Sequence, residues 1–380
     1  MAQTEVVIVS AVRTPIGSFL GSLSSLRAHE LGTIVIKEAI QRANVAANEV
    51  SEVIVGQALT AGQGQNTARQ ASINAGLPNG TSAWCINMLC GSGLKSVNCG
   101  YSAIRSGDAS IVVAVGQESM SQAQHAVYMR SGAKLSNVEL VDTLIHDGLT
   151  DAFEKVHMGI TAENIAKQYK IPRENQDAQA LESQKRTENA QKNGYFKKEI
   201  VPVTVKTRKG DIIVSDDEYP KHGTTLESLT GLKPAFQKGG TVTPGNASGI
   251  NDGAAAVVLT DKETAVKRGL PILAKIVAFS QEGVEPSVMG LGPIPAVQTV
   301  LRKAGWSIED VDLFELNEAF AAQALAVNQD LKIDPAKVNI HGTRVLVTLI
   351  YALERTGGKK GVASLCIGGG MGIAIAIERP

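Results

Sequence analysis

Residues 86–98 read INMLCGSGLKSVN, and the order of residue types in this stretch indicates how the chain folds around it. An apolar, strand-like run leads to Cys90, and Gly91-Ser92-Gly93 separate the cysteine from a segment with helical periodicity. A turn of this kind between a strand and a helix exposes the residue that it carries. The dipole of the following helix favours a thiolate, and the glycines leave room for a ligand beside the backbone. We therefore predict that Cys90 is a nucleophile.

The other cysteines near this turn lack its setting. A buried cysteine often packs as a small apolar side chain, and this alternative is weaker for Cys90 than for Cys85 or Cys99. Neither of these two has flanking glycines, and Cys99 falls inside the predicted helix. Four cysteines in 380 residues, without a CxxC pair, indicate neither a disulfide framework nor a zinc site, so a reducing compartment is expected.

Outward from this turn, short β-branched runs alternate with helical patterns along the chain. The runs include VVIVS at 6–10, EVIVG at 52–56, IVVAVG at 111–116 and AAAVVLT at 254–260. This alternation predicts an α/β protein with a sheet buried on both faces. Between residues 120 and 245 the sequence becomes more polar, which indicates an inserted and more exposed layer.

The chain also contains an approximate internal repeat. The order EVIVG, CGSG-helix, IVVAVGQES in the first part resembles DLFEL, HG-helix, VASLCIGGG in the second part. Two similar halves that face each other are expected, with Cys90 and Cys366 in corresponding positions. About 34 residues separate Gly56 from Cys90, whereas about 25 separate Leu316 from His341, so the second half is short at this point.

A second candidate site surrounds Cys366, which shortly precedes the run Gly368-Gly369-Gly370. Consecutive glycines can turn backbone N–H groups toward a developing negative charge, so Cys366 could act as a nucleophile or as a base. A glycine-rich strand turn beside a buried cysteine is the alternative. Taken together, the two cysteines indicate one covalent carrier and one proton acceptor. Asn317, after the strand-like DLFEL, could hold a water through its amide or simply cap the next helix.

Composition argues against several classes of protein. Lys and Arg together number 37, as do Asp and Glu, so no global charge attracts nucleic acid or a membrane surface. No apolar run reaches the length of a membrane span, and the first residues leave no room for a signal or transit segment. We expect a soluble protein of the cytoplasm that has neither a nucleic-acid nor a membrane partner.

Several blocks of sequence together resemble the thiolase family: VRTPIGSF, NMLCGSGLK, GQESMS, VHMGITAENIA, GNASGINDGAA, ELNEAFA and CIGGGMG. They follow the family's order along the chain, and as a set they are far more specific than any one block. The cytosolic acetyl-CoA C-acetyltransferase branch fits best. The resemblance implies the five-layer αβαβα thiolase fold. Residues 1–119 and 246–270 would form an N-terminal half-domain, 120–245 a loop domain and 271–380 a C-terminal half-domain.

The resemblance also implies a reaction and an assembly. The reaction is the reversible Claisen condensation of two acetyl-CoA molecules to acetoacetyl-CoA and CoA, without a metal or redox cofactor, in a homotetramer. By position, Cys90 would carry the acetyl group and Cys366 would move the α-proton. Gly368 and Cys90 would offer N–H groups to one oxyanion, and Asn317 would help to hold the other thioester oxygen through a water.

Contacts with the substrate are implied in the same way. Lys221 stands where relatives generally have arginine, which keeps the charge but loses the planar fork for phosphate. For Met289 and Phe320, ordinary core packing is the alternative. The implied contacts are Met289 and Phe320 at the small acyl pocket, His157 and Ser248 along the pantetheine arm, Ser228 near the adenosine and Lys221 near the phosphates.

At one place the sequence departs from the family. Thiolases have a segment similar to NxxGGAIALGHPxGASG, whose histidine activates the nucleophilic cysteine, whereas here VNIHG at 338–342 runs directly into Thr343. About thirteen residues are missing, in agreement with the short second half. Loss of a general base costs about 10²–10⁴ in rate and loss of an oxyanion donor about 10²–10³, so impaired catalysis is expected. His341 lies about eight positions before the family's histidine, and a loop residue facing solvent is the favoured interpretation.

Two other functions stay open at this point. The missing segment, with the ligand positions retained, is compatible with a catalytically silent CoA-binding or assembly subunit. A degradative 3-ketoacyl-CoA thiolase is the third possibility, which the absence of a targeting segment and the VHMG and PSVMG blocks disfavour.

Overall fold

The structure is a computed structural model that describes residues 4–339 and 345–380. His341, Gly342 and Thr343, on which the expected deletion falls, lie outside the described residues. In the part of the chain that is described, the main strands follow one hydrogen-bonded path, and this path consists of two halves of five strands each.

The first half begins at the centre of the path and ends at a free edge. β1 (Val6–Arg13) pairs antiparallel with β10 (Asn251–Asp261), which pairs antiparallel with β5 (Ile111–Ser119). β5 lies parallel to β3 (Glu52–Gly56), and β3 lies parallel to the edge strand β4 (Ser82–Ile86). The apolar runs in the sequence therefore mark these strands correctly.

The second half repeats the arrangement. β11 (Ala274–Gly283) pairs antiparallel with β15 (Met371–Glu378), and β15 pairs antiparallel with β14 (Lys360–Ile367). β14 lies parallel to β12 (Leu313–Leu316), and β12 lies parallel to β13 (Val338–Asn339). Order and directions match the first half, so the internal repeat is confirmed. Val7 opposite Lys275 and Ile8 opposite Ala274 join the two halves.

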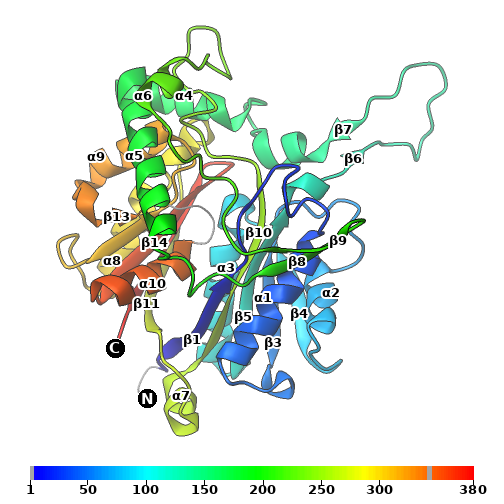
Figure 1. The fold of residues 1–380 in the computed structure, drawn as a ribbon, viewed down its shortest axis with the longest axis vertical. Coiled ribbons are helices and arrows are strands. Elements are labelled where there is room, and N and C mark those ends of the chain that lie inside the picture. The colour runs from blue at the N-terminus through cyan, green and yellow to red at the C-terminus, as the bar shows by residue number, and fades with distance from the viewer. Residues whose placement is uncertain (1–3, 340–344) are drawn as a thin grey trace.

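Helices form three layers around the two halves, as Figure 1 shows. The outer core of the first half is shared with two helices, and the outer core of the second half with two others. A third core lies between the two halves of the sheet and takes side chains from both halves. The predicted αβαβα arrangement is thereby confirmed. The outer helices are α1 (Ala28–Arg42) and α2 (Thr67–Asn74) on the first half and α8 (Pro293–Ala304) and α9 (Ala321–Leu331) on the second, and the central ones are α3 (Ser92–Ser106) and α10 (Val345–Thr356).

α10 begins directly after the segment that falls outside the described residues. Its buried residues include Leu346, Ile350 and Leu353, which lie on one face at helical spacing. Full burial of a side chain of this size contributes about 1.5–3 kcal/mol. The helix is therefore retained by its packing in the central layer, although the strand-to-helix connection is short.

The chain between β5 and β10, two neighbouring strands, leaves the sheet and forms a layer of its own. Figure 1 shows α4 and α6 above α9, α5 beside α9, and a hairpin, β6–β7, that projects away from the rest. The insertion agrees with the change in sequence character after residue 120, while the domain boundaries stay a prediction. Its elements are β6 (His125–Ala126), β7 (Val141–Asp142), α4 (Met158–Gln168), α5 (Arg173–Lys192), β8 (Val203–Thr207), β9 (Gly210–Val214) and α6 (Leu226–Thr230).

A buried ion cluster ties this inserted region to the central sheet. Arg13 at the end of β1 lies 2.6 Å from Glu199 and 2.7 Å from Asp217, and all three side chains are almost completely buried. Thr348 of α10 donates a hydrogen bond to Glu199 at 3.0 Å. Loss of one member of such a cluster leaves a buried charge without its partner, which typically costs about 3–5 kcal/mol.

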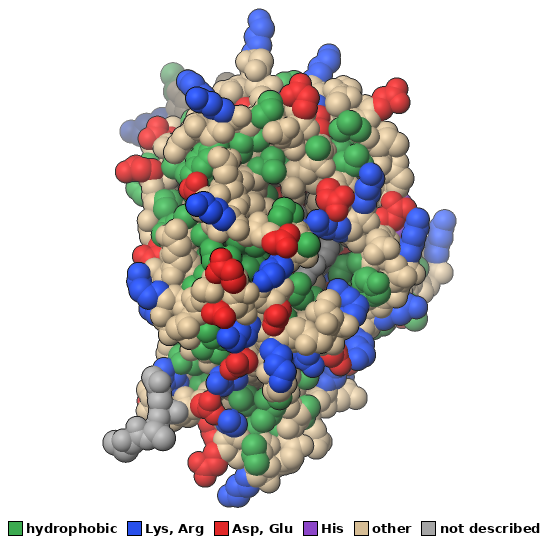
Figure 2. Space-filling model, turned by 90° about the vertical axis from the view of Figure 1, so that its left-hand side faces the viewer, with side chains coloured by type: hydrophobic (Ala, Val, Ile, Leu, Met, Phe, Trp, Pro, Cys, Tyr) green, Lys and Arg blue, Asp and Glu red, His purple; other side chains and the backbone are tan. Residues whose placement is uncertain are grey.

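The surface agrees with the balanced composition. Figure 2 shows Lys and Arg interspersed with Asp and Glu on the face that it presents. This face therefore carries no extended patch of a single charge. Among the described residues, the helices are all too short or too polar to cross a membrane.

Candidate active site

Cys90 lies on the turn that the sequence predicts. β4 ends at Ile86, a single 3₁₀ turn covers Leu89–Gly91, and α3 begins at Ser92. The turn packs against the second half, since a Cβ on Gly91 would come within 2.5 Å of Ile367 Cδ1. The glycine is required here by this close approach, and the prediction of a strand-to-helix turn is confirmed.

Two N–H groups point at the sulfur of Cys90. The residue is exposed, but protein atoms crowd around the thiol, and this partial removal from water raises the pKa of Cys90. Hydrogen bonds from the backbone N–H groups of Gly368 and of Cys90 itself act in the opposite direction, while the charge of Glu118 adds to the rise. The structure therefore brings together the two N–H groups that the resemblance assigns to one oxyanion.

Gly368 belongs to a tight connection between β14 and β15. Gly369 and Gly370 have φ angles of +82° and +84°, which side chains other than glycine rarely allow. A Cβ on Gly370 would lie 2.2 Å from the carbonyl oxygen of Val284. The predicted glycine-rich turn thus places one backbone N–H of the second half on the cysteine of the first.

Cys366 is buried at the end of β14, with 1% of its surface exposed. Burial raises the pKa of the Cys366 thiol, and the negative charge of Cys90 raises it further. The two sulfur atoms therefore lie close enough for the charge of Cys90 to affect the ionisation of Cys366. Around Cys366 lies an apolar cluster made of Met158, Ala162, Val242, Met289 and Phe320, with Phe236, Ala247 and Ala319 at its margin.

Asn317 follows β12 and lies beside Cys366, because its N–H donates to the carbonyl of Ser364 at 3.0 Å. The alternative that Asn317 caps the next helix is wrong. α9 begins at Ala321, and its N-cap residue is Phe320. The intervening residues hold an extended path, since Phe320 forms a bridge with Ala247. Asn317 is thus free of a capping role and half-buried at the site.

The two cysteines do not occupy corresponding positions in the repeat, contrary to the expectation. Cys90 follows β4, whose counterpart is β13, so its counterpart falls in the segment outside the described residues. Cys366 ends β14, whose counterpart is β5. The residue related to Cys366 therefore lies at the end of β5, near Glu118. The sequence motif had the right order of elements, but only the strand pairing shows which ends correspond.

Glu118 is a site residue that the sequence did not single out. Its carboxylate accepts N–H hydrogen bonds from Ala58 at 2.8 Å and Leu59 at 3.2 Å. Burial, opposed by these two bonds and supported by the charge of Asp252, raises the pKa of Glu118 to about 7. A carboxylate two residues after the buried run IVVAVG at 111–116 was the available signal, because the carboxyl ends of parallel strands meet at one edge.

His157 lies beside the apolar cluster around Cys366. It precedes α4, and its Nδ1 accepts the N–H of Gly159 at 3.0 Å. The ring stacks on Phe236 at 4.7 Å, and Phe236 in turn meets the edge of Phe320 at 6.3 Å. Burial lowers the pKa of His157. The histidine is therefore held neutral, with its Nε2 available to donate.

A backbone hydrogen bond places Ser248 beside the same apolar cluster. Its N–H donates to the carbonyl of Ala319 at 2.8 Å, next to Phe320, and the side chain is exposed. The structure thus groups Cys90, Cys366, Gly368 and Asn317 with the predicted pocket and pantetheine residues. These contacts bring four residues to one region: the acyl-pocket pair Met289 and Phe320, and the pantetheine pair His157 and Ser248.

Lys221 and Ser228 lie farther out on the inserted region. The N–H of Lys221 donates to Gln184 at 3.0 Å, and the side chain is exposed. Ser228 is also exposed, and its hydroxyl donates to the carbonyl of Thr225 at 2.7 Å at the start of α6. These hydrogen bonds link neither residue to the two cysteines, so the predicted roles of Lys221 and Ser228 stay predictions.

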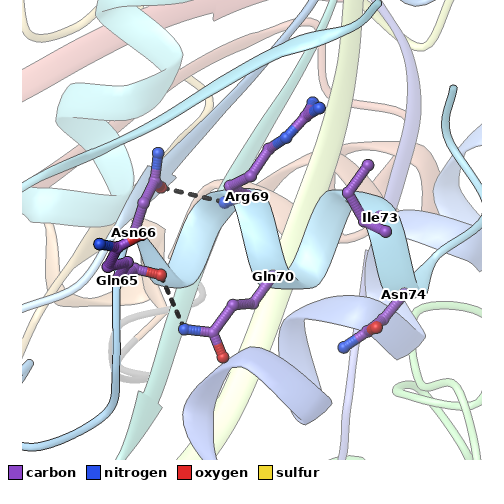
Figure 3. Close-up of a pocket in the computed structure, with 6 residues that line it drawn as sticks. All are labelled: Gln65, Asn66, Arg69, Gln70, Ile73 and Asn74. Carbon is purple, nitrogen blue, oxygen red and sulfur yellow. Dashed lines mark hydrogen bonds between the residues drawn. The ribbon is translucent and has the colours of Figure 1, made fainter. Parts of the chain in front are cut away.

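A shallow hollow on another face has no part in this site. It has a volume of about 580 Å³ and lies along α2, as Figure 3 shows. Asn66 accepts the N–H of Arg69 there and so caps the helix. Five of the hollow's six lining residues are polar or charged, and none of the six is a predicted site residue. It is formed by Gln65, Asn66, Arg69, Gln70, Ile73 and Asn74.

The arrangement suits covalent transfer of an acyl group. Cys90 is exposed, and the N–H groups of Gly368 and of Cys90 itself point at its sulfur. N–H donors that hold an oxyanion are each worth about 10²–10³ in rate. The buried Cys366 is kept as a neutral thiol by its surroundings and by the charge of Cys90. A pocket that only binds a ligand would require neither the N–H groups at Cys90 nor the buried thiol of Cys366. Fold and site together are those expected of an acyltransferase whose two cysteines meet between two similar halves.

Comparison with known proteins agrees with this class. Residues 6–263 match the family described as thiolase, N-terminal domain, and residues 270–379 match thiolase, C-terminal domain. The chain therefore belongs to the thiolase family.

Relatives resemble the chain over its full length. An acetyl-CoA acetyltransferase of Paracoccus denitrificans is 54% identical over 99% of this chain and 100% of its own length. A cytosolic acetyl-CoA acetyltransferase of Mus musculus is 57% identical over 98% of both chains. The first alignment spans 390 positions, whereas this chain has 380 residues, so that relative has at least ten residues that this chain lacks.

Solved structures share the fold closely. The acetyl-CoA acetyltransferase of Bacillus anthracis superimposes with a TM-score of 0.98 at 44% identity and covers 100% of both chains. Human mitochondrial 3-ketoacyl-CoA thiolase superimposes with a TM-score of 0.96 at 41% identity, again over 100% of both chains.

Proposed function

We propose that this protein is an acetyl-CoA C-acetyltransferase that joins two acetyl-CoA molecules into acetoacetyl-CoA and CoA through an acetyl-Cys90 intermediate. The observation that carries the proposal is the convergence of Gly368 N–H, from the second half, on the thiol of Cys90, with Cys366 close by. The names of the relatives support the same substrate class.

In the first step the sulfur of Cys90 attacks the thioester carbon of acetyl-CoA. A C–S bond to Cys90 forms, the negative charge on the oxygen is held by the N–H groups of Gly368 and Cys90, and the bond to CoA breaks. The proton that the Cys90 thiol loses on attack passes to the sulfur of CoA, which leaves as a thiol. The donors are in place before the charge develops, so little reorganisation is needed.

In the second step the Cys366 thiol gives its proton to solvent, and the resulting thiolate removes the α-proton of another acetyl-CoA. The resulting carbanion attacks the acetyl carbon on Cys90, a C–C bond forms and the thiolate of Cys90 leaves. Asn317 is half-buried beside Cys366, where a water held by its amide would stabilise the second thioester oxygen. The thiol of Cys366 is hard to ionise while Cys90 is anionic, and acetylation removes that charge. This supports the order of the two steps.

Substrate contacts follow the same proposal. Met289 and Phe320 pack around Cys366 and leave an apolar surround that suits a short acyl chain. His157 and Ser248 would lie along the pantetheine arm, with Ser228 near the adenosine and Lys221 near the phosphates. The reaction as proposed needs no metal or redox cofactor, because thiolate and thiol carry both the acyl group and the proton.

Catalysis in this chain is proposed to be impaired. The family's GHP histidine has no counterpart in the sequence after Gly342, and the length of the alignment with relatives supports a deletion. Loss of this base corresponds to about 10²–10⁴ in rate. The same deletion favours one rival, a silent CoA-binding or assembly subunit.

Self-association is part of the proposal, with a homotetramer in the cytoplasm as the assembly. Two surfaces support it. Within the described residues, β4 pairs on one side only, with β3, and a free strand edge of this kind is usually covered. The loop between β6 and β7 exposes large apolar side chains, including Tyr128 at 78% and Leu135 at 97%.

Intact mass measurement tests the proposal. Purified protein is incubated with acetyl-CoA, and an acetyl adduct on Cys90 is expected, absent from the Cys90→Ser variant. CoA binding is measured separately by calorimetry. Binding without an adduct would instead support the silent subunit.

A variant with the missing segment restored tests whether the deletion alone impairs catalysis or whether the proposed function is wrong. Restoring the missing segment after Gly342 is expected to raise thiolysis of acetoacetyl-CoA by about 10²–10⁴. In that protein, a preference for long 3-ketoacyl-CoA over acetoacetyl-CoA would favour a degradative thiolase.

A further inference from the structure

Leu89, the residue before Cys90, has a backbone conformation that leucine rarely adopts. Its φ angle is +46°, in the left-handed region, and it lies inside the turn that carries the nucleophile. A residue other than glycine stays in this region only where surrounding contacts hold it. The contacts around Leu89 therefore decide where Cys90 points.

Side chains hold both peptide groups of Leu89. Its N–H donates to Oδ1 of Asn87 at 2.9 Å. Its carbonyl accepts a hydrogen bond from the hydroxyl of Ser92 at 2.7 Å, and that hydroxyl also accepts the N–H of Met88 at 2.8 Å. A side-chain oxygen bonded to an N–H two residues on is a common way to fix a tight turn.

Asn87 is in turn fixed to the sheet. Its Nδ2 donates to the carbonyl of Ala58 at 3.1 Å, and the N–H of Ala58 donates to Glu118 at 2.8 Å. Asn87, Ala58 and Glu118 follow or end the adjacent strands β4, β3 and β5. A continuous set of hydrogen bonds therefore runs from the edge of the sheet to the residue before the nucleophile.

We infer that Asn87 is a positioning residue for Cys90. Together with Ser92, Asn87 holds Leu89 in its left-handed conformation and so sets the direction of Cys90. The inference rests on the proposed role of Cys90 as the nucleophile. Asn87 does not act on the substrate, and its effect passes through the turn.

On the opposite face of the turn, the side chain of Leu89 lies against the backbone that donates to Cys90. A Cβ on Gly368 would lie 3.0 Å from Cδ1 of Leu89, so the leucine side chain packs against the glycine whose N–H points at Cys90. Moving Leu89 therefore changes the hydrogen bond that favours the thiolate. Loss of that bond slows reactions of the thiol and shifts them to higher pH.

Alkylation of Cys90 by iodoacetamide, followed across pH by peptide mass spectrometry, tests this inference. Asn87→Ala is expected to slow alkylation about tenfold at neutral pH and to move its pH midpoint upward. Asn87→Ser keeps an oxygen that can accept the N–H of Leu89, so its rate should stay within about threefold of the unchanged protein. The serine variant also keeps the test decisive if the alanine variant fails to fold.

Rescue by glycine distinguishes positioning from general damage. In a Leu89→Gly background the positive φ costs little, so adding Asn87→Ala should change alkylation less than about twofold. Asn74→Ala on α2, an equal truncation away from the turn, should leave alkylation unchanged. An equal tenfold loss in the glycine background, or an Asn87→Ala protein that alkylates normally, would overturn the inference.

The reagent also separates this inference from the proposed function. Iodoacetamide requires neither bound CoA nor the missing histidine. If acetyl-CoA fails to modify Cys90 while the alkylation pattern holds, the proposed function fails and the positioning role stands.

Discussion

Cys90 and Cys366 lie close together, but different kinds of structure hold them. Cys90 is exposed on a turn whose preceding residue has a φ angle of +46°, and side-chain hydrogen bonds fix that turn. Cys366 is buried in regular strand among apolar side chains. Burial raises the pKa of both thiols, but at Cys90 the N–H groups of Gly368 and of Cys90 itself oppose the rise, whereas at Cys366 the charge of Cys90 adds to it. The difference suits one thiol to attack and the other to exchange a proton.

The same contrast extends to the residues that the repeat relates. The position at the end of β5 that corresponds to Cys366 carries a carboxylate, Glu118, which supports a loop rather than facing the apolar cluster. Two halves with the same strand order have therefore specialised. In the proposed mechanism, one half supplies the nucleophile and the residues that support it, and the other supplies the base, the N–H of Gly368 and the apolar pocket.

Removal of the buried thiol of Cys366 should have the largest effect on the proposed division of roles between the two cysteines. Cys366→Ala is expected to retain the acetyl adduct on Cys90 but to lower condensation by about 10²–10⁴, because only the second step needs the proton acceptor. The measurement uses the protein with the segment restored after Gly342, by intact mass for the adduct and by acetoacetyl-CoA formation for the second step. Cys99→Ala is the matched control. Unchanged condensation in the Cys366→Ala protein would contradict the division of roles.

Truncation of the apolar surround tests how far packing holds the second cysteine. Met289 is 3% exposed beside Cys366, so Met289→Ala should lower the free energy of unfolding by about 2–5 kcal/mol. Chemical denaturation measures this change. Val266→Ala, at a side chain that is 65% exposed on α7 (Lys262–Arg268), should change it by less than about 0.5 kcal/mol. A similar small loss at Met289 would show that the pocket is loosely packed.

A smaller effect concerns Glu318, which adjoins Asn317. Burial, opposed by a hydrogen bond from Gln179 at 3.1 Å, raises the pKa of Glu318 to about 7. Since the unfolded chain has the ordinary value of 4.5, the folded state holds this proton more tightly. The stabilisation is complete below pH 4.5 and is lost as the pH rises through about 7.

Glu318→Gln should therefore lose less stability than the unchanged protein between pH 5 and pH 7.5, by a difference on the order of 1 kcal/mol. Denaturant titrations at several pH values measure it. Glu227→Gln, at an exposed carboxylate on α6, provides the control. Parallel curves for both variants and the unchanged protein would mean that Glu318 ionises normally in the folded state.

Much of this site was accessible from the sequence, because its signals are local. Glycines beside Cys90 and after Cys366 predict turns, and apolar runs predict the strands that end there. The helical pattern after Gly93 likewise predicts α3. Each of these depends on a few neighbouring residues, whose backbone preferences are encoded where they stand.

Three features were not accessible in this way. The capping alternative for Asn317 was open until the start of α9 at Ala321 was seen. The left-handed conformation of Leu89 depends on Asn87 and on a loop about thirty residues earlier. The pKa of Glu118 depends on burial and on two N–H groups from another strand end.

By itself, the sequence determined the order of strands and helices, the family, and the turns that carry Cys90 and the glycines near Cys366. Only the tertiary structure decided which ends of the two halves correspond, and that Gly368 points its N–H at Cys90. The physical reason is the distance along the chain. Hydrogen bonds and burial that join segments hundreds of residues apart leave no local pattern, because each partner is an ordinary residue until the sheets are assembled.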